Sequence, residues 1–316
     1  MRRPAIESKG FGSFLPLDVP LEPELVVVIW NPRQFVLRKA ESGVNSAGKR
    51  ILGDEVIGLL ISVKDTVEAN VVSRFPVSIL DIKDPAKGAL GAAAPAVLEK
   101  IAGSLPGSVQ LSFSAGELAD WRVQIDRLNS ASEGGNPNSG SGPQGCLLNR
   151  YPEELLARFR FVKIGLAGMS QIQNWPDYWR ALFEGLPKST RPVAVAYLDY
   201  QDADSPSPSD VIKMAGEHPN CSTILFDTFC KSKDLFGSLE SEDLQALLLT
   251  SQKANLKTVV AGSVSIETLE RVMRCRPDLV GVRGAVCRGG RADNVDQALV
   301  NDWIREMQAR EHLICD

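Results

Sequence analysis

Charged side chains follow four apolar, strand-like segments of this 316-residue sequence, and their types suit chemistry on amines. Residues two apart in a strand share a face, so Asp81 and Lys83 should point the same way, as should Asp227 and Lys231 if that strand continues. We therefore expect a pocket that holds several amines beside carboxylates. The four segments end in Ile79-Leu80-Asp81-Ile82-Lys83, Phe161-Val162-Lys163, Leu225-Phe226-Asp227-Thr228 and Val280-Gly281-Val282-Arg283.

Lysines grouped in this way are suited to covalent catalysis. A free lysine has a pKa of about 10.4 and is protonated at neutral pH, but neighbouring cations and removal from water lower that pKa. The free amine can then form a Schiff base with a carbonyl, while a second amine or a carboxylate moves protons. The alternative for any single lysine is a solvated strand end paired with Asp81 or Asp227. Four charged strand ends together favour the catalytic interpretation.

Composition and charge argue against nucleic-acid and membrane partners. The formal net charge is -4 and the basic residues are dispersed, which indicates no nucleic-acid partner. The sequence contains no apolar run of about 18 residues, and Met1-Arg2-Arg3-Pro4 is not followed by the apolar stretch of a signal peptide. We expect a cytoplasmic protein that acts on a small molecule, without a membrane partner.

Cysteine and histidine usage gives no indication of a metal centre. The six cysteines form no CxxC pair, which argues against a zinc ribbon or a disulfide framework. The two histidines, His218 and His312, lie in peripheral segments. We therefore predict no metal and no cofactor, so that acid/base chemistry falls to Lys, Asp, Glu, Tyr or Cys.

Alternation of short β-branched runs with amphipathic stretches predicts eight βα units from Asp54 onward. The predicted fold is α/β, a single (βα)8 TIM barrel over residues 53–316, with an N-terminal extension at 1–52 whose role the sequence does not reveal. Residues 130–147 are rich in Ser, Gly, Asn and Pro and are interpreted as a flexible insertion. Strands are expected at 56–63, 77–83, 109–114, 161–165, 192–198, 222–227, 257–261 and 279–283. The clearest helices are expected at 93–102, 117–128, 153–159, 241–254, 265–275 and 296–311.

In such a barrel the carboxyl ends of the strands carry the active site, and side chains from alternate strands share a layer. The even-numbered strands then bring together Lys83, Lys163, Asp227 with Lys231, and Arg283. The fifth strand adds Tyr197 and Asp199, again two residues apart.

Glycine-rich backbone follows the last two predicted strands, where barrels commonly bind phosphate through backbone N–H groups. The expected phosphate site consists of Gly262, Ser263, Arg283 and Gly284, with Arg288 as a second source of positive charge. The alternative is a flexible turn before the last helix. The position of these glycines in the barrel favours phosphate.

The sequence from about Gly58 to the C-terminus resembles the (5-formylfuran-3-yl)methyl phosphate synthase family of methanofuran biosynthesis, a branch of one-carbon metabolism. The family loop after the third strand usually contains Gly-Asp, whereas here Gly116 is followed by Glu117. The first fifty or so residues and the insertion have no recognised counterpart. The resemblance rests on 80–85, 87–92, 162–166, Asp227-Thr228 with Lys231, Ala261-Gly262-Ser263 and 280–290.

The resemblance implies a lyase that condenses two molecules of glyceraldehyde 3-phosphate into 4-(hydroxymethyl)-2-furancarboxaldehyde phosphate, releasing phosphate and water. It implies Lys83 as the Schiff-base lysine and Lys163 as the proton acceptor. It also implies that Asp81, Asp227 and Lys231 line the same site. Tyr197 and Asp199 match a Tyr-x-Asp of the family.

Two other functions stay open at this point. The first is another phosphosugar aldolase or decarboxylase on the same fold, because an Asp-x-Lys also suits proton transfer in phosphate-binding barrels. The second is a non-catalytic sensor that binds a sugar phosphate and uses residues 1–52 for partners. A homo-oligomer is compatible with either, since barrels often pair through exposed helices.

Overall fold

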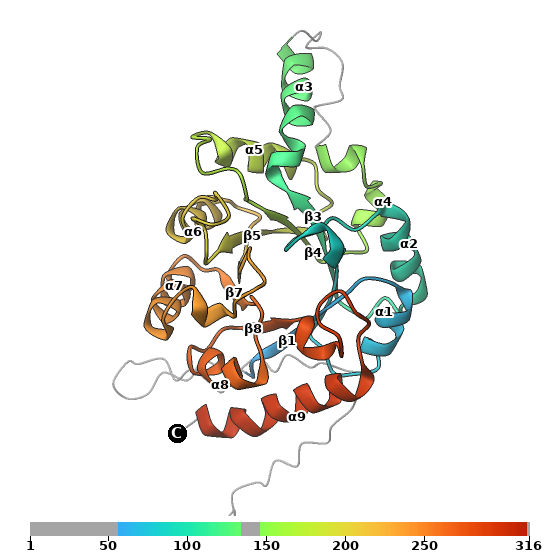
Figure 1. The fold of residues 1–316 in the computed structure, drawn as a ribbon. Coiled ribbons are helices and arrows are strands. Elements are labelled where there is room, and N and C mark those ends of the chain that lie inside the picture. Colours follow the sequence, from blue (N-terminus) through green and yellow to red (C-terminus); the bar gives the residue numbers. More distant parts are fainter. Residues whose placement is uncertain (1–55, 134–145, 315–316) are drawn as a thin grey trace, which may run out of the picture. The chain divides into compact units, whose positions relative to one another are not determined.

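In the computed structural model of the protein, residues 56–133 and 146–314 are described. Eight parallel strands pair in chain order, and β8 pairs with β1, so that the sheet closes into a barrel with helices around it (Figure 1). The predicted (βα)8 TIM barrel is therefore confirmed. The strands are β1 Gly58–Val63, β2 Ile79–Ile82, β3 Leu111–Glu117, β4 Phe161–Gly165, β5 Arg191–Tyr197, β6 Thr223–Asp227, β7 Lys257–Val260 and β8 Leu279–Val282.

Helices follow each strand, and one additional short helix precedes β4. Short 3₁₀ turns, among them Pro85–Lys87, Leu118–Trp121, Cys146–Asn149 and Gly284–Val286, lie in the connections. The α-helices are α1 Thr66–Val72, α2 Pro95–Ser104, α3 Arg122–Glu133, α4 Glu153–Leu156, α5 Trp175–Leu182, α6 Pro208–Glu217, α7 Ser241–Lys253, α8 Ile266–Arg274 and α9 Gln297–Ile314.

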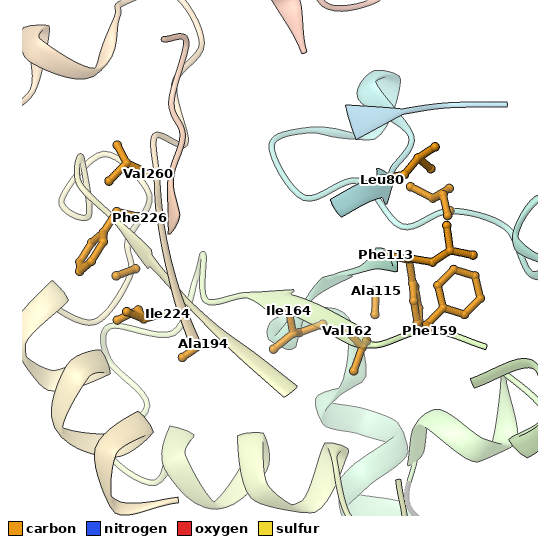
Figure 2. Packing of buried hydrophobic residues seen from close by; sticks show 14 of the residues in the cluster. Leu80, Phe113, Ala115, Phe159, Val162, Ile164, Ala194, Ile224, Phe226 and Val260 are labelled. Carbon is orange, nitrogen blue, oxygen red and sulfur yellow. The ribbon is translucent and has the colours of Figure 1, made fainter. Parts of the chain in front are cut away.

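Side chains of each strand alternate between the barrel interior and the helical shell, as the two-residue period of a strand requires. On β2, Leu80 and Ile82 belong to the large cluster between strands and helices, whereas Ile79 belongs to the smaller cluster inside the barrel. Figure 2 shows part of the outer cluster around Leu80, Phe113 and Phe226. Because Asp81 has the same parity as Ile79, it faces the barrel interior.

The third strand extends beyond its predicted end. The sequence predicted a strand at 109–114 and a helix from Glu117, but β3 continues to Glu117 and the helix begins only at Arg122. Gly116 has a φ of 95°, and the pairing with β4 shifts register between Ser114 and Glu117. This irregularity carries Glu117 to the carboxyl end of the barrel.

The end of the sixth strand also differs from one expectation. β6 ends at Asp227, so Lys231 is not a strand residue that points inward by alternation. Its side chain instead returns from the following loop. The Lys231 amine therefore reaches the site from the loop after β6 and not from the strand.

Two predicted segments lie largely outside the described residues: the N-terminal extension at 1–52, and residues 134–145 of the insertion predicted at 130–147. Of the residues flanking 134–145, Ser130 lies in α3, and Cys146 and Leu147 are buried in the turn before α4. Among the described residues, no helix is long and apolar enough to cross a membrane.

Candidate active site

Asp81 is the buried anchor of the site. Its neighbours across the sheet are Ser62 on β1 and Ser112 on β3, and both hydroxyls donate to it, at 2.9 Å to Oδ2 and 2.6 Å to Oδ1. Burial raises the pKa of Asp81, but the charges of Lys163 and Lys83 outweigh burial and hold that pKa below its usual value. The carboxylate is therefore fixed in its charged form.

Lys163 on β4 is bound to that carboxylate. Its Nζ lies 2.5 Å from Oδ1 of Asp81, and only 4% of the residue is exposed. Ser114 pairs with Lys163 across the sheet, and its fully buried hydroxyl has no hydrogen-bond partner in the described part of the chain. A buried hydroxyl without a partner is costly, which makes Ser114 a candidate to bind a substrate oxygen or a water molecule.

A second lysine and aspartate pair lies on the opposite side of the barrel. The Nζ of Lys231 lies 2.6 Å from Oδ1 of Asp227 and also donates to the carbonyl of Thr228. The backbone N–H of Thr228 donates to the same aspartate at 2.8 Å. Burial raises the pKa of Asp227, but Lys231 and Lys83 together hold it below its usual value. Lys231 is thus bound by charge and by backbone.

Lys83 differs from both of these lysines. Within the described ranges neither a hydrogen bond nor an ion pair holds its amine, although it feels the charges of both lysine and aspartate pairs. Burial lowers the pKa of Lys83 to about 8, with Asp227 opposing the shift and Lys231 adding to it. A cavity of about 300 Å³ lies beside this residue, lined also by Lys64, Asp65, Asp84, Ala93, Ala94 and Val97.

Asp199 acts on the backbone of the neighbouring loop. Its two oxygens accept the N–H groups of Phe229 at 2.7 Å and Cys230 at 2.8 Å. These two residues directly precede Lys231. Asp199 therefore orients the loop that carries Lys231.

Glu117 is a further candidate site residue, which the predicted set of site residues did not include. Its carboxylate accepts the Tyr197 hydroxyl at 2.7 Å and the backbone N–H of Ala167 at 3.0 Å. Gly165 makes room for this contact, since a Cβ there would lie 2.0 Å from the Glu117 carboxylate and 2.5 Å from the Tyr197 hydroxyl. Burial raises the pKa of Glu117, and the departure from Gly-Asp at this position was the available sequence signal.

Tyr197 completes this arrangement from β5. It is fully buried, its ring packs edge-on against Phe229 at 5.5 Å between centroids, and burial together with the Glu117 charge holds its pKa well above the usual value. The hydroxyl is therefore protonated and donates to Glu117. Tyr197 and Glu117 form a paired acid and carboxylate at the carboxyl ends of β5 and β3.

The predicted phosphate loops follow β7 and β8. Gly262 and Ser263 have positive φ angles of 101° and 53°, and a Cβ on Gly262 would come within 3.0 Å of the backbone N of Thr228. The backbone N–H groups of Gly262, Ser263 and Gly284 have no acceptor among the described residues. Free amides at this end of a barrel are suited to an anion.

Arg283 does not direct its guanidinium into the lysine cluster. All five of its N–H groups are used: they donate to Glu68, to the carbonyl of Ser62, and to the carbonyls of Arg291 and Asp293. Phosphate binding by Arg283 stays a prediction, and in this structure its contacts are those of a buried structural ion pair. Arg288 extends to the surface, where it pairs with Asp296.

Oxygen and sulfur ligands come together at one place in the described residues. Candidate ligand atoms of Asp199, Asp202 and Cys230 all lie within 4.8 Å of one another. Both Asp199 oxygens already accept backbone N–H groups, and Asp202 is exposed. The Asp199 carboxylate is therefore already used to hold the backbone of the loop before Lys231.

The chain is similar to proteins of known name. Proteins named (5-formylfuran-3-yl)methyl phosphate synthase are similar to this chain: that of Methanosarcina barkeri is 27% identical over 79% of this chain and 99% of the relative. That of Methanococcus maripaludis strain C7 is 26% identical, over 79% of this chain and 97% of the relative.

The solved structure of a phosphoribosyl anthranilate isomerase from Thermus thermophilus is similar over 80% of this chain and 99% of its own. Its sequence identity is 12% and its TM-score is 0.47, and we infer nothing further from it.

The family model described as 4-HFC-P synthase matches residues 59–304, which include the lysines, the aspartates and both glycine-rich loops. The chain belongs to the 4-HFC-P synthase family.

Proposed function

We propose that this protein condenses two molecules of glyceraldehyde 3-phosphate into (5-formylfuran-3-yl)methyl phosphate through a Schiff base on Lys83. The observation that carries the proposal is the contrast among the three lysines. Lys163 and Lys231 are each bound by an aspartate, whereas the Lys83 amine has no such partner in the described residues and its pKa is lowered to about 8. Lys83 is therefore the lysine best able to be an uncharged nucleophile.

The first stage forms an iminium ion. One triose phosphate isomerises to the ketone, and the free amine of Lys83 adds to its carbonyl carbon. Lys163, held by Asp81, donates a proton to the departing hydroxyl, which leaves as water. That transfer leaves Lys163 uncharged and able to remove the proton from the carbon next to the iminium, which gives an enamine.

The second stage forms the carbon–carbon bond. The enamine attacks the aldehyde carbon of the second triose phosphate. Lys231, which is paired with Asp227, is assigned to protonate the oxygen that becomes negative. Loss of one phosphate, ring closure, hydrolysis of the imine and dehydration complete the furan. Two triose phosphates then yield one furan phosphate, one inorganic phosphate and two water molecules, so the atoms balance.

Phosphate recognition is assigned to the loops after β7 and β8. The backbone N–H groups of Gly262, Ser263 and Gly284 have no acceptor among the described residues, and phosphate oxygens suit such donors. Ser114 and the Glu117–Tyr197 pair are left to bind hydroxyl or carbonyl oxygens of the substrates.

The test is to incubate the purified protein with glyceraldehyde 3-phosphate and to follow inorganic phosphate together with the ultraviolet absorption of a conjugated furan aldehyde. We expect both signals to rise, and both to be lost in Lys83→Ala and in Lys83→Arg, whose guanidinium stays protonated. Lys100→Ala, which removes an exposed lysine of α2, is the control and should keep wild-type rates.

The alternatives give different outcomes in the same assay. A phosphosugar decarboxylase or another aldolase would turn over a different phosphosugar and would release no phosphate from glyceraldehyde 3-phosphate. A sensor would bind triose phosphate without any turnover. A role in methanofuran biosynthesis and a cytoplasmic location are also part of this proposal.

A further inference from the structure

The segment 291–293, between β8 and α9, is bound along its backbone by two cations from the barrel. The Nε of Arg283 donates to the carbonyl of Arg291 at 2.6 Å, and its Nη2 donates to that of Asp293 at 3.1 Å. Between them, the Nζ of Lys64 donates to the carbonyl of Ala292 at 2.9 Å. Three consecutive carbonyls thus accept charge-assisted hydrogen bonds, so this loop is held in a defined position.

Glu68 on α1 holds the cations in turn. Its carboxylate accepts both terminal nitrogens of Arg283, at 2.8 and 3.2 Å, and lies 3.7 Å from the Nζ of Lys64. The side chains of Arg283 and Glu68 are 3% and 2% exposed. A buried pair with this many partners fixes the backbone that it contacts and has no donor left for a ligand.

The side chain of Arg291 is the part of this segment that keeps free donors. Its Nη2 donates to the carbonyl of Gly88, in the loop after β2, at 2.7 Å. No acceptor for its Nε or Nη1 occurs in the described part of the chain. Arg291 is half-buried, and its remaining N–H groups can bind an anion through charge-assisted hydrogen bonds.

Arg291 also lies next to the predicted phosphate loop. A Cβ built on Gly284 would lie 3.7 Å from the backbone N of Arg291 and 3.8 Å from its Cβ. The N–H of Gly284 has no acceptor among the described residues. The guanidinium is also close enough to the lysine cluster to feel the charge of Asp227.

The other cations of the site are already neutralised by carboxylates, so a bound phosphate requires one more positive charge. Lys163 and Lys231 are neutralised by Asp81 and Asp227, and Arg283 by Glu68. Lys83 must be uncharged to react. A phosphate dianion that binds at the mouth therefore requires a further positive charge with donors to spare.

We propose that Arg291, rather than Arg283, supplies the guanidinium that binds the substrate phosphate, together with the backbone N–H of Gly284. Arg291 thereby selects phosphorylated over unphosphorylated trioses. This assignment rests on the proposed function for the identity of the phosphate ester, but the anion site itself is defined by the contacts above. Arg283 is a positioning residue that acts through the backbone of 291–293.

The test compares Arg291→Gln and Arg291→Lys with the wild type, using inorganic phosphate in isothermal titration calorimetry and glyceraldehyde 3-phosphate in turnover. Arg291→Gln should weaken phosphate binding and raise KM by about 10- to 100-fold, since one charge-assisted contact is lost. Arg291→Lys should fall between it and the wild type, because an ammonium keeps the charge but not the forked geometry. Trapping of unphosphorylated glyceraldehyde on Lys83 by borohydride should be unchanged in both variants.

The control is Arg274→Gln, which removes the same charge from the exposed face of α8 and should leave phosphate affinity and KM unchanged. Unchanged phosphate affinity and KM in Arg291→Gln would overturn the proposal, and a loss of stability alone would indicate that Arg291 only links two loops. Phosphate affinity lost in Arg291→Gln, in a protein that makes no furan, would support this site while rejecting the proposed synthase activity. Furan formation by Arg291→Gln with the KM of the wild type would support the proposed synthase activity and would reject Arg291 as the phosphate-binding residue.

Discussion

At the scale of single residues, the charged neighbours of each lysine in the site determine whether its amine can react as a nucleophile. The charge of Lys231 contributes to the lowered pKa of Lys83, and that of Asp227 opposes it. Removing either one should therefore shift the titration of Lys83 in a known direction. The two shifts should have opposite signs.

We predict that imine formation on Lys83 in the wild type increases with pH through a midpoint near pH 8, because the neutral amine reacts. Lys231→Gln removes a cation and leaves Asp227 unneutralised, so the midpoint should rise by roughly one pH unit. Asp227→Asn should lower the midpoint. The measurement is the initial rate of borohydride trapping with triose phosphate across a pH series; shifts of the same sign, or none, would contradict this electrostatic account.

Gly165 provides a second test at this scale. Alanine at this position would drive a Cβ into the Glu117 carboxylate and the Tyr197 hydroxyl, so both side chains must move. We expect Gly165→Ala to lower kcat by about 100-fold, the cost of displacing a site by about 1 Å. It should destabilise the fold by about 1–3 kcal/mol, as overpacking does. Turnover assays and urea unfolding measure the two effects.

Gly103→Ala is the matched control. Gly103 lies inside α2, and a Cβ there would meet no atom within 4 Å. Because alanine is a better helix former, this variant should gain about 0.5–1 kcal/mol and keep its activity. Wild-type kcat in Gly165→Ala would show that the contact between Glu117 and Tyr197 is not needed for turnover.

Among the elements, α1 is joined to the residue that directly follows β8 by the buried ion pair of Glu68 and Arg283. Replacing Glu68 with Gln leaves a buried guanidinium without its counter-charge. We predict a loss of about 3–5 kcal/mol in the free energy of unfolding, measured by urea denaturation. Glu99→Gln, at an exposed position of α2, should change stability by less than about 0.5 kcal/mol. A loss of similar size in both variants would contradict a special role for the pair.

The elements themselves were largely predictable from sequence, because hydrophobic period and barrel topology act locally. Asp81, Lys83 and Lys163 follow strand alternation, and the two pairs with aspartate agree with the expected grouping of charges. The partner of Arg283 was not predictable, because Glu68 lies 215 residues away in the sequence. Glu117 was missed because its partners come from two other strands and Gly165 contributes only by lacking a side chain.

At the scale of the whole molecule, the barrel is closed by the direct pairing of β8 with β1. Residues 1–52 are not needed for this closure. The predicted division at residue 53 therefore leads to a clear experiment. A fragment of residues 53–316 should unfold cooperatively with urea and should keep the kcat of the full chain. Loss of cooperative unfolding or of turnover in the fragment would show that residues 1–52 belong to the catalytic domain.

The most direct test of the central claim is to identify the residue that forms the covalent intermediate. Triose phosphate and borohydride are added to the wild type, Lys83→Ala, Lys163→Ala and Lys231→Ala, and the modified peptide is identified by mass spectrometry. We predict a reduced adduct on Lys83 in the wild type, retained in lower yield without Lys163 or Lys231 and absent in Lys83→Ala. An adduct on Lys163 or Lys231 in the wild type, or undiminished labelling in Lys83→Ala, would contradict the account.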